Sequence, residues 1–256
     1  MRIMTFNLRF DNERDGENSW NNRKDLVIQM IEKFTPSILG TQEGTMQQLL
    51  FMRERLPDYA MHEPARSQED HSCQYPTLFY RVEELDLLTG SEFWLSRTPR
   101  VHRSKDWDSA FPRMMSYALF ADRHEGRKLW AVVTHLDHLG VEARQEQAKM
   151  IAEWISTQSE PVILMGDFNA VPGSTVHDLL VDPATGLQDT WQMLIHAENY
   201  LSMTHHGFVG VPQRGRLDWI LVTGQFRATA AVVVRDRFEG RYPSDHYPYF
   251  VDLDWT

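Results

Sequence analysis

Cysteine is almost missing from this chain, with Cys73 the single one among 256 residues. One thiol forms no internal disulfide, and without a second thiol a zinc–thiolate site is excluded as well. Long apolar runs are missing too, because no stretch approaches the roughly 20 residues of a membrane-spanning helix. Even the first apolar segment, residues 3–10, contains Asn7 and Arg9. These absences argue against a disulfide scaffold and a membrane protein, and a reducing cytoplasm is the expected compartment.

Positive charge is also scarce. Lys and Arg number 26 against 36 Asp and Glu, which gives a formal net charge of −10. The chain as a whole therefore repels polyanions and lacks the sequence-independent attraction on which most nonspecific nucleic-acid binders depend. Any nucleic-acid binding must be local, so a small or short single-stranded substrate is expected rather than long duplex DNA. Clustered carboxylates have another use, since hard divalent cations require them.

Apolar residues, at 42% of the chain, suffice to bury a large core. Apolar runs predict strands, and apolar residues at helical spacing predict helices. The predicted strands are 2–10, 38–41, 78–81, 116–120, 129–133, 162–165, 219–222, 228–234 and 249–253, and the predicted helices are 23–34, 46–56 and 143–156. Because no repeat or linker divides the chain, residues 1–256 are expected to form one α/β domain with no evident obligate protein partner. The long loops 11–22, 97–112 and 199–216 are candidate functional segments.

Polar residues recur where the predicted strands begin or end. They are Asn7, Glu43, His135, Asp167, Asn169, Asp218, Asp245 and His246. Sites in α/β folds assemble outside strand ends, so these side chains are expected to converge on one cleft. Four carboxylates meeting there would raise one another's pKa and destabilise the fold unless a cation lay among them. Oxygen ligands without thiolates suit Mg²⁺ or Mn²⁺ better than zinc.

Six short motifs occur in a fixed order: FNLR at 6–9, TQE at 41–43, THLDH at 134–138, GDFN at 166–169, RLDWI at 216–220 and SDH at 244–246. Together they resemble the endonuclease/exonuclease/phosphatase superfamily, in its bacterial type, over nearly the whole chain. The resemblance implies a four-layer α/β sandwich of two packed mixed β-sheets flanked by helices. It also implies a divalent-metal-dependent hydrolase of phosphate esters, with a nuclease or phosphodiesterase put first. The alternatives are a sugar or inositol phosphate monoesterase and, less favoured, a non-catalytic metal-binding interaction module.

The resemblance further implies how the metal and the water are held. Glu43 would be the principal ligand of Mg²⁺ or Mn²⁺, with Asn7 and Asp245 close to the same ion. Asp167 would orient the attacking water and help to deprotonate it. Asn169, two residues further along, would hold that water or a phosphate oxygen.

It also implies roles for groups that contact the phosphate. Asp218 would pair with His246 and favour the charged form of its ring. His135 would act near the leaving oxygen, as a general acid or as a hydrogen-bond donor to the transition state. Arg113 is the candidate substrate-binding residue, because a guanidinium suits phosphate oxygens. A diester is expected to be cleaved faster than a monoester, since the histidine would assist a departing alkoxide.

Two local features qualify the resemblance. Asp245 and His246 are adjacent and would point to opposite faces of a regular strand, so an irregular backbone is expected there, which Pro243 favours. Val133 stands where many relatives have Asn, which puts a supporting hydrogen bond in doubt but not the chemistry.

Several further residues are weaker candidates. The segment 98–107 mixes three cations with an aromatic residue and is a possible contact surface for phosphate and bases, although most charged loops are only solvated. Trp20, Arg23 and Trp94 are similar candidates. His138 is expected to be a structural hydrogen-bonding group, with metal ligation as the alternative, and His205 and His206 are expected to shape the rim of the cleft.

Overall fold

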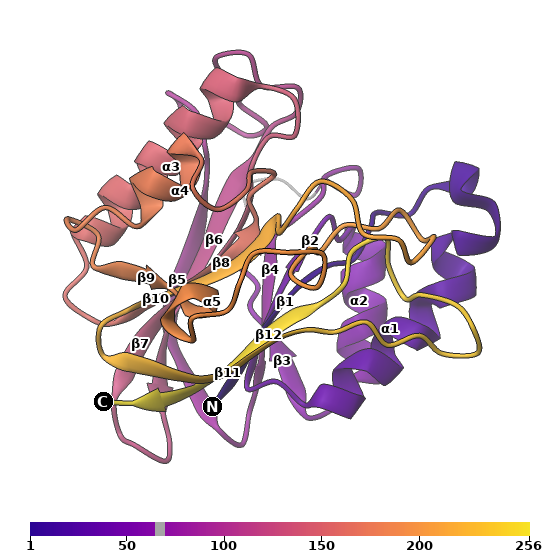
Figure 1. Ribbon diagram of the computed structural model, residues 1–256, viewed down its shortest axis with the longest axis horizontal. Coiled ribbons are helices and arrows are strands. Elements are labelled where there is room, and N and C mark those ends of the chain that lie inside the picture. Colours follow the sequence, from indigo (N-terminus) through magenta and orange to yellow (C-terminus); the bar gives the residue numbers. More distant parts are fainter. Residues whose placement is uncertain (65–69) are drawn as a thin grey trace.

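The computed structural model describes residues 1–64 and 70–256, and within them the strands form two six-stranded sheets (Figure 1). The first sheet has the order β11-β12-β1-β2-β4-β3, with strands Phe226–Val233, Tyr249–Trp255, Arg2–Asn7, Ile38–Gln42, Thr77–Arg81 and Tyr59–Met61. The second has the order β5-β6-β7-β8-β10-β9, with strands Leu85–Trp94, Met114–Asp122, Lys128–His135, Val162–Asp167, Asp218–Thr223 and Leu187–Asp189. Each sheet is mixed, because β1 runs parallel to β2 and β7 parallel to β8 while the other pairs are antiparallel.

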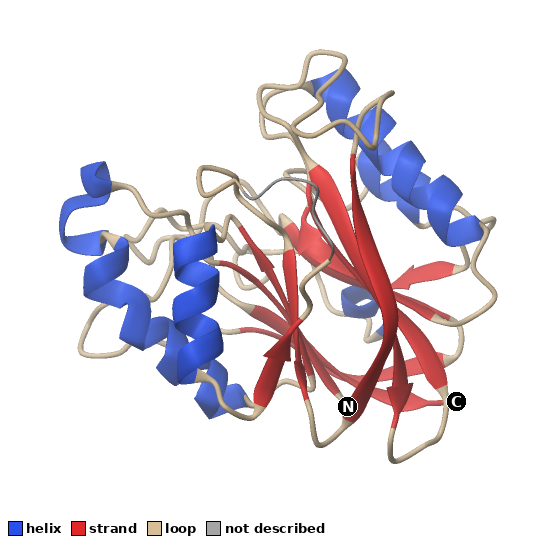
Figure 2. Cartoon of the chain, turned by 180° about the vertical axis from the view of Figure 1, so that it is seen from behind, coloured by secondary structure: helices blue, strands red, loops and turns tan. Residues whose placement is uncertain are grey.

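Helices cover the outer faces of both sheets (Figures 1 and 2). Helices α1 (Trp20–Phe34) and α2 (Met46–Arg55) lie on the first sheet, and α3 (Val141–Ser156) and α4 (Thr175–Leu180) lie on the second. Two short helices, η1 (Glu13–Asn18) and α5 (Thr190–Met193), complete the described elements. The order helix, sheet, sheet, helix confirms the four-layer sandwich.

Apolar residues on alternate faces of the same strand fill different layers. Ile3 of β1 packs in the core between the sheets, whereas its neighbour Met4 packs against α1 and α2. In the second sheet, Met165 faces the core between the sheets and Leu164 faces α3 and α4. Strands buried on both faces must be apolar throughout, which is why the sequence shows continuous apolar runs here rather than alternation.

The predicted strands and helices are all present, with boundaries moved by a few residues. Strands β3, β5 and β9 and helices η1, α4 and α5 were not predicted. The expectation of a loop over 11–22 is partly wrong, because η1 forms there and α1 begins at Trp20. Loops 97–112 and 199–216 contain no helix or strand. None of the described helices has the length and apolar character that crossing a membrane requires.

The two parallel strand pairs position the site. Asn7 lies opposite Gln42 at the ends of β1 and β2, and His135 lies opposite Asp167 at the ends of β7 and β8. Asp218, the first residue of β10, pairs with Asp167 on its other side. Close approach of β7 and β8 requires the glycine of GDFN, since a Cβ on Gly166 would lie 2.2 Å from the Thr134 carbonyl oxygen. The carboxyl ends of both pairs therefore meet at one edge of the sandwich.

Candidate active site

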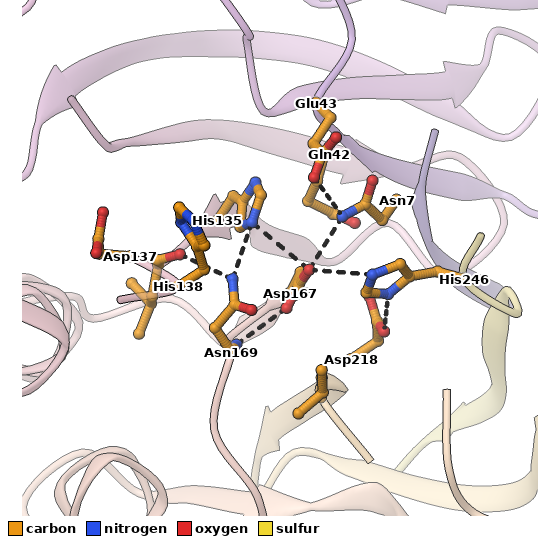
Figure 3. A network of polar contacts seen from close by, with 12 residues as sticks. Asn7, Gln42, Glu43, His135, Asp137, His138, Asp167, Asn169, Asp218 and His246 are labelled. Carbon is orange, nitrogen blue, oxygen red and sulfur yellow. Dashed lines mark hydrogen bonds and ion pairs between the residues drawn. The ribbon is translucent and has the colours of Figure 1, made fainter. Parts of the chain in front are cut away.

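Asp167 is the centre of a buried polar network (Figure 3). Its Oδ2 accepts a hydrogen bond from Nδ2 of Asn7 at 3.0 Å, and its Oδ1 accepts one from the backbone N–H of Asn169 at 2.9 Å. Two imidazole rings flank the same carboxylate, with Nε2 of His135 at 3.5 Å and Nε2 of His246 at 3.7 Å from Oδ2. The network thus joins β1, β7, β8 and the segment before β12.

The surroundings of Asp167 shift its ionisation towards neutral pH. Burial raises the pKa of its carboxyl group to about 7, and the Asp218 carboxylate adds to the increase. The charge of His246 and the hydrogen bonds from Asn169 and Asn7 act in the opposite direction. A carboxyl group with such a pKa both releases and accepts a proton near physiological pH.

Asp218 and His246 form a buried pair. Nδ1 of His246 lies 2.8 Å from Oδ2 of Asp218. Burial alone would lower the pKa of His246, but the attraction of Asp218 and then of Asp167 outweighs it and raises the pKa to about 10. His246 is therefore an imidazolium ion at neutral pH. The structure brings together the two residues that the sequence paired.

Arg113 contacts two histidines of the THLDH motif. Its Nη1 lies 3.0 Å from Nδ1 of His135, and its Nη2 lies 3.2 Å from Nδ1 of His138. A guanidinium group only donates hydrogen bonds, so both Nδ1 atoms must accept and each neutral ring carries its proton on Nε2. Burial, followed by the charge of Arg113, lowers the pKa of His135 well below its ordinary value and also lowers that of His138. Both rings are thus neutral donors.

Asn169 lies between His135 and the chain that follows it. It adopts a left-handed backbone conformation, with φ of 48°. Its Nδ2 is 3.0 Å from Nε2 of His135 and 3.1 Å from the carbonyl oxygen of Leu136. Nε2 of His135 carries a proton, so it and Nδ2 of Asn169 are two donors that face each other. A phosphate oxygen placed between these two nitrogens would accept hydrogen bonds from both.

The expected metal ligands lie on two sides of Arg9. Oε1 of Glu43 accepts a hydrogen bond from Nδ2 of Asn7 at 3.2 Å, and Oε2 accepts one from the backbone of Phe10 at 3.1 Å. Oδ2 of Asp245 lies 3.9 Å from Nε of Arg9. Hydrogen bonding to Asp15 is the largest cause that raises the pKa of Arg9, and the charges of Asp245 and Glu43 add to it. Asn7 and Glu43 are thus in direct contact, while Asp245 approaches from another segment.

Two groups of three side chains have potential ligand atoms within 4.8 Å of one another in the described parts of the chain. One consists of His205, Asp245 and His246, and the other of Asp167, Asp218 and His246. His205 was expected only to shape the rim of the cleft, because it lies forty residues before Asp245 in a long loop and local sequence does not reveal its partners. Segment 243–248 is irregular, which confirms the expected backbone and lets Asp245 and His246 face the same cleft. Neither group of three includes Glu43, which offers carboxylate oxygens of the kind that a hard divalent cation prefers, while Asn7 turns its amide nitrogen towards it.

Asp137, the fourth residue of THLDH, holds the loop that precedes β6. Its fully buried carboxylate accepts backbone N–H bonds from Ala110 and Phe111 at Oδ2 and from Leu139 and Gly140 at Oδ1. This places the ring of Phe111, 56% exposed, in a stack on His138 with 5.6 Å between the ring centroids. Asp137 therefore fixes the rim of the cleft.

Three of the weaker candidates are largely buried, and none of them is hydrogen-bonded to Asp167 or its histidines. Trp20 and Trp94 belong to the apolar core beneath α1 and α2. Arg23 is 2% exposed and donates to backbone carbonyl groups, including those of Leu8 and Pro243. It joins the end of β1 to the segment that carries Asp245.

Two cations of segment 98–107 are engaged in contacts within the protein. Arg103 bonds to Asp70 and Ser72, and Lys105 donates to two carbonyl groups of the same loop. A hollow of about 120 Å³ beside Glu43 and His135 is lined in part by Arg103. One cation of the segment therefore reaches the cleft.

Comparison with known proteins identifies the family. The model of the endonuclease/exonuclease/phosphatase family matches residues 4–246. The chain belongs to this family. Its members hydrolyse phosphoric esters and depend on a divalent metal, so the protein is a phosphoric ester hydrolase.

Similar proteins, two of them of known structure, cover most of the chain. A mannosyl-6-phosphatase of Bacteroides thetaiotaomicron is 30% identical with a TM-score of 0.90, and the alignment covers 100% of both chains. Protein L388 of Acanthamoeba polyphaga mimivirus is 28% identical over 192 residues, which are 66% of this chain and 67% of L388. A TDP2 of D. rerio, complexed with a single-strand DNA product, shares the fold with a TM-score of 0.78 at 16% identity, covering 99% of this chain and 98% of that one.

Proposed function

We propose that the protein hydrolyses phosphate monoesters of small, sugar-like molecules with a water activated at Asp167. The observation that carries the mechanism is the position of Asp167 between a neutral and a charged histidine. Such a carboxylate accepts the proton of a water whose oxygen attacks phosphorus on the side opposite the leaving oxygen.

The two histidines have different tasks in this mechanism. His246, charged and held by Asp218, stabilises the negative charge that develops on the phosphoryl oxygens. His135 donates a hydrogen bond from Nε2 to a phosphoryl or leaving oxygen. Two roles were expected for His135, general acid and hydrogen-bond donor. The donor role is the one supported, because a neutral ring that gave up its proton would become an imidazolate, which is unfavourable. The bond between phosphorus and the leaving oxygen breaks, and the leaving alkoxide gains its proton from His246 or from solvent.

A divalent cation belongs beside Asn7 and Glu43, with Asp245 as the third ligand. When bound, it neutralises charge on the phosphoryl group. Mg²⁺ or Mn²⁺ is proposed, since Glu43 and Asp245 supply carboxylate oxygens and none of the three residues supplies a thiolate or an imidazole. Arg113 is assigned a positioning role instead of the phosphate contact that the sequence suggested, because both of its Nη atoms are engaged by histidine rings.

The size of the cleft and the likeness to the mannosyl-6-phosphatase support the substrate class. Hollows of about 120 and 460 Å³ adjoin the site residues, which suits a small molecule. The full-length likeness at 30% identity favours the monoesterase, which the sequence left as an alternative, over the nuclease that it put first. The net charge of −10 agrees with a small substrate.

The test compares mannose 6-phosphate, p-nitrophenyl phosphate and bis(p-nitrophenyl) phosphate at equal Mg²⁺ concentration. The monoesters should have the higher kcat/KM, and Asp167→Asn should abolish turnover of all three while far-ultraviolet circular dichroism remains unchanged. Asp58→Asn, at an exposed position away from the network, is the matched control. A clear preference for the diester would establish a phosphodiesterase instead, and an active Asp167→Asn enzyme would refute the mechanism.

A further inference from the structure

A second hollow extends from the site on the side of α3 and α4. This groove, of about 460 Å³, begins at His138 and Asn169. Val141 and Val171, both partly exposed, form apolar walls, and Arg144 and Arg214 bring two cations to it. The groove thus adjoins Asn169, whose amide lies where a phosphate oxygen would be bound.

The charge of this groove differs from that of the protein. The chain carries a net charge of −10, yet none of the described residues that line the groove is Asp or Glu. Two arginines without a carboxylate attract an anion in a molecule that otherwise repels anions. The substrate's reacting phosphate lies elsewhere, at Asp167 and the histidines, so the groove has charge left for another anionic group.

Arg214 is the cation that is free to bind a ligand. Its side chain is exposed and forms no ion pair or hydrogen bond with residues 1–64 or 70–256. It lines the groove together with His138 and Asn169, at the end that adjoins the site. Arg144 is held in place, because one of its Nη atoms donates to the carbonyl oxygen of Asp137 at 2.8 Å.

Among the described residues, the smaller hollow beside Glu43 and His135 has no cation that is free to bind a ligand. Its two cations are engaged, because Arg103 is paired with Asp70 at 3.0 Å and Arg113 contacts the rings of His135 and His138, and its lining includes the carboxylate of Glu43. An anionic extension of the substrate is therefore attracted towards Arg214 and not towards Arg103.

We propose that the groove binds a second phosphate of the substrate, with Arg214 as its principal contact and Arg144 beside it. A guanidinium binds phosphate oxygens in a bidentate manner, and the valine walls accept the carbon skeleton between the two phosphates. The enzyme then prefers compounds with two phosphates over those with one. This assignment rests on the proposed hydrolysis of phosphate esters, and the second phosphate belongs either to a small bisphosphorylated sugar or to the next position of a short nucleic-acid strand.

The experiment measures kcat/KM for two matched pairs of substrates in the parent enzyme and in Arg214→Gln. One pair is fructose 1,6-bisphosphate and fructose 6-phosphate, and the other is the 5′-phosphorylated thymidine dinucleotide and thymidine 5′-phosphate, which share the 5′-monoester and differ in the second phosphate. In the parent, the doubly phosphorylated member of at least one pair should be preferred. Arg214→Gln should reduce that preference by roughly 10-fold or more, mainly through KM.

Inhibition provides a second readout, which does not require turnover of the bisphosphate itself. Inhibition of p-nitrophenyl phosphate hydrolysis by adenosine 3′,5′-bisphosphate should weaken by a similar factor in Arg214→Gln. Arg227→Gln is the matched control, because Arg227 is exposed on β11 and pairs with Asp254 outside the groove. It should leave both the preference and the inhibition unchanged.

The outcomes separate this inference from the proposed function. Preference within the sugar pair identifies a bisphosphorylated sugar, and preference within the dinucleotide pair identifies a strand. Hydrolysis of p-nitrophenyl phosphate without preference in either pair, or a preference that survives in Arg214→Gln, overturns the phosphate subsite and leaves the proposed function standing. Hydrolysis of none of these esters overturns both.

Discussion

Nη1 of Arg113 donates to Nδ1 of His135 across 3.0 Å, and both side chains are buried. The contact determines which nitrogen of the ring carries the proton, because an arginine has no atom that accepts one. The same guanidinium acts on His138 through Nη2. One arginine thus orients two histidines of the cleft as donors.

Replacing this arginine should therefore change the tautomer of His135. Lysine has one nitrogen and does not contact both rings, so Arg113→Lys should lower kcat roughly 100-fold, with a smaller change in KM. Long-range ¹H–¹⁵N NMR spectra should show a loss of the Nε2–H form of His135. Arg227→Lys serves as the control. An unchanged tautomer together with an unchanged kcat would contradict the assignment of Arg113 as a positioning residue.

Asp218 and His246 should act as one unit. Asp218→Asn removes the charge that keeps the His246 ring protonated, so it should lose much of the activity that His246→Ala loses. The double variant should be little slower than the slower single variant. The measurement is a double-mutant cycle on kcat/KM, and losses that simply multiply would show that the two residues act independently.

Chelation should abolish hydrolysis, and Mg²⁺ or Mn²⁺ should restore it. Glu43→Gln keeps the size of the side chain but removes its charge, so it should weaken metal binding and reduce activity by at least about 100-fold. Isothermal titration calorimetry with Mn²⁺ measures the metal binding directly. The control is Glu54→Gln, at an exposed position of α2. Full activity in excess chelator would rule out the metal site.

Asp137 should make stability depend on pH in the acid range. Burial opposes its ionisation, but backbone N–H bonds, led by that of Gly140, outweigh burial and lower its pKa to about 2. An unfolded Asp has a pKa of about 3.9, so the ionised group contributes about 2 kcal/mol that is present above that pH and is lost as the pH falls through the folded value.

Asp137→Asn should remove this contribution, because an amide nitrogen would face backbone donors. Urea unfolding at pH 7 should show a loss of about 2 kcal/mol or more. Between pH 4 and pH 2 the parent should lose more stability than the variant. Equal slopes in that range would mean that another group controls acid stability.

The sequence alone determined the main strands and singled out the polar residues that the structure gathers at one edge of the sandwich. β1, β2, β7 and β8 are buried along most of their length, so each contains a mostly apolar run that a single sequence reveals. A buried polar residue at the end of such a run is unfavourable unless it forms polar contacts there, so it is a candidate site residue. β5 lacks this signal, since most of its residues are at least partly exposed and no apolar face recurs along it.

The tertiary structure alone decided which side chains meet. Arg23 and Arg113 carry the same group as Arg214, and nothing in the local sequence distinguishes them, yet the first two are buried by distant segments and the third remains exposed beside the cleft. His205 joins Asp245 and His246 only because the loop before β10 returns to the segment before β12. Local periodicity records which face of an element is apolar, but the partner of a polar side chain depends on contacts between residues far apart in the chain, and those exist only in the folded state.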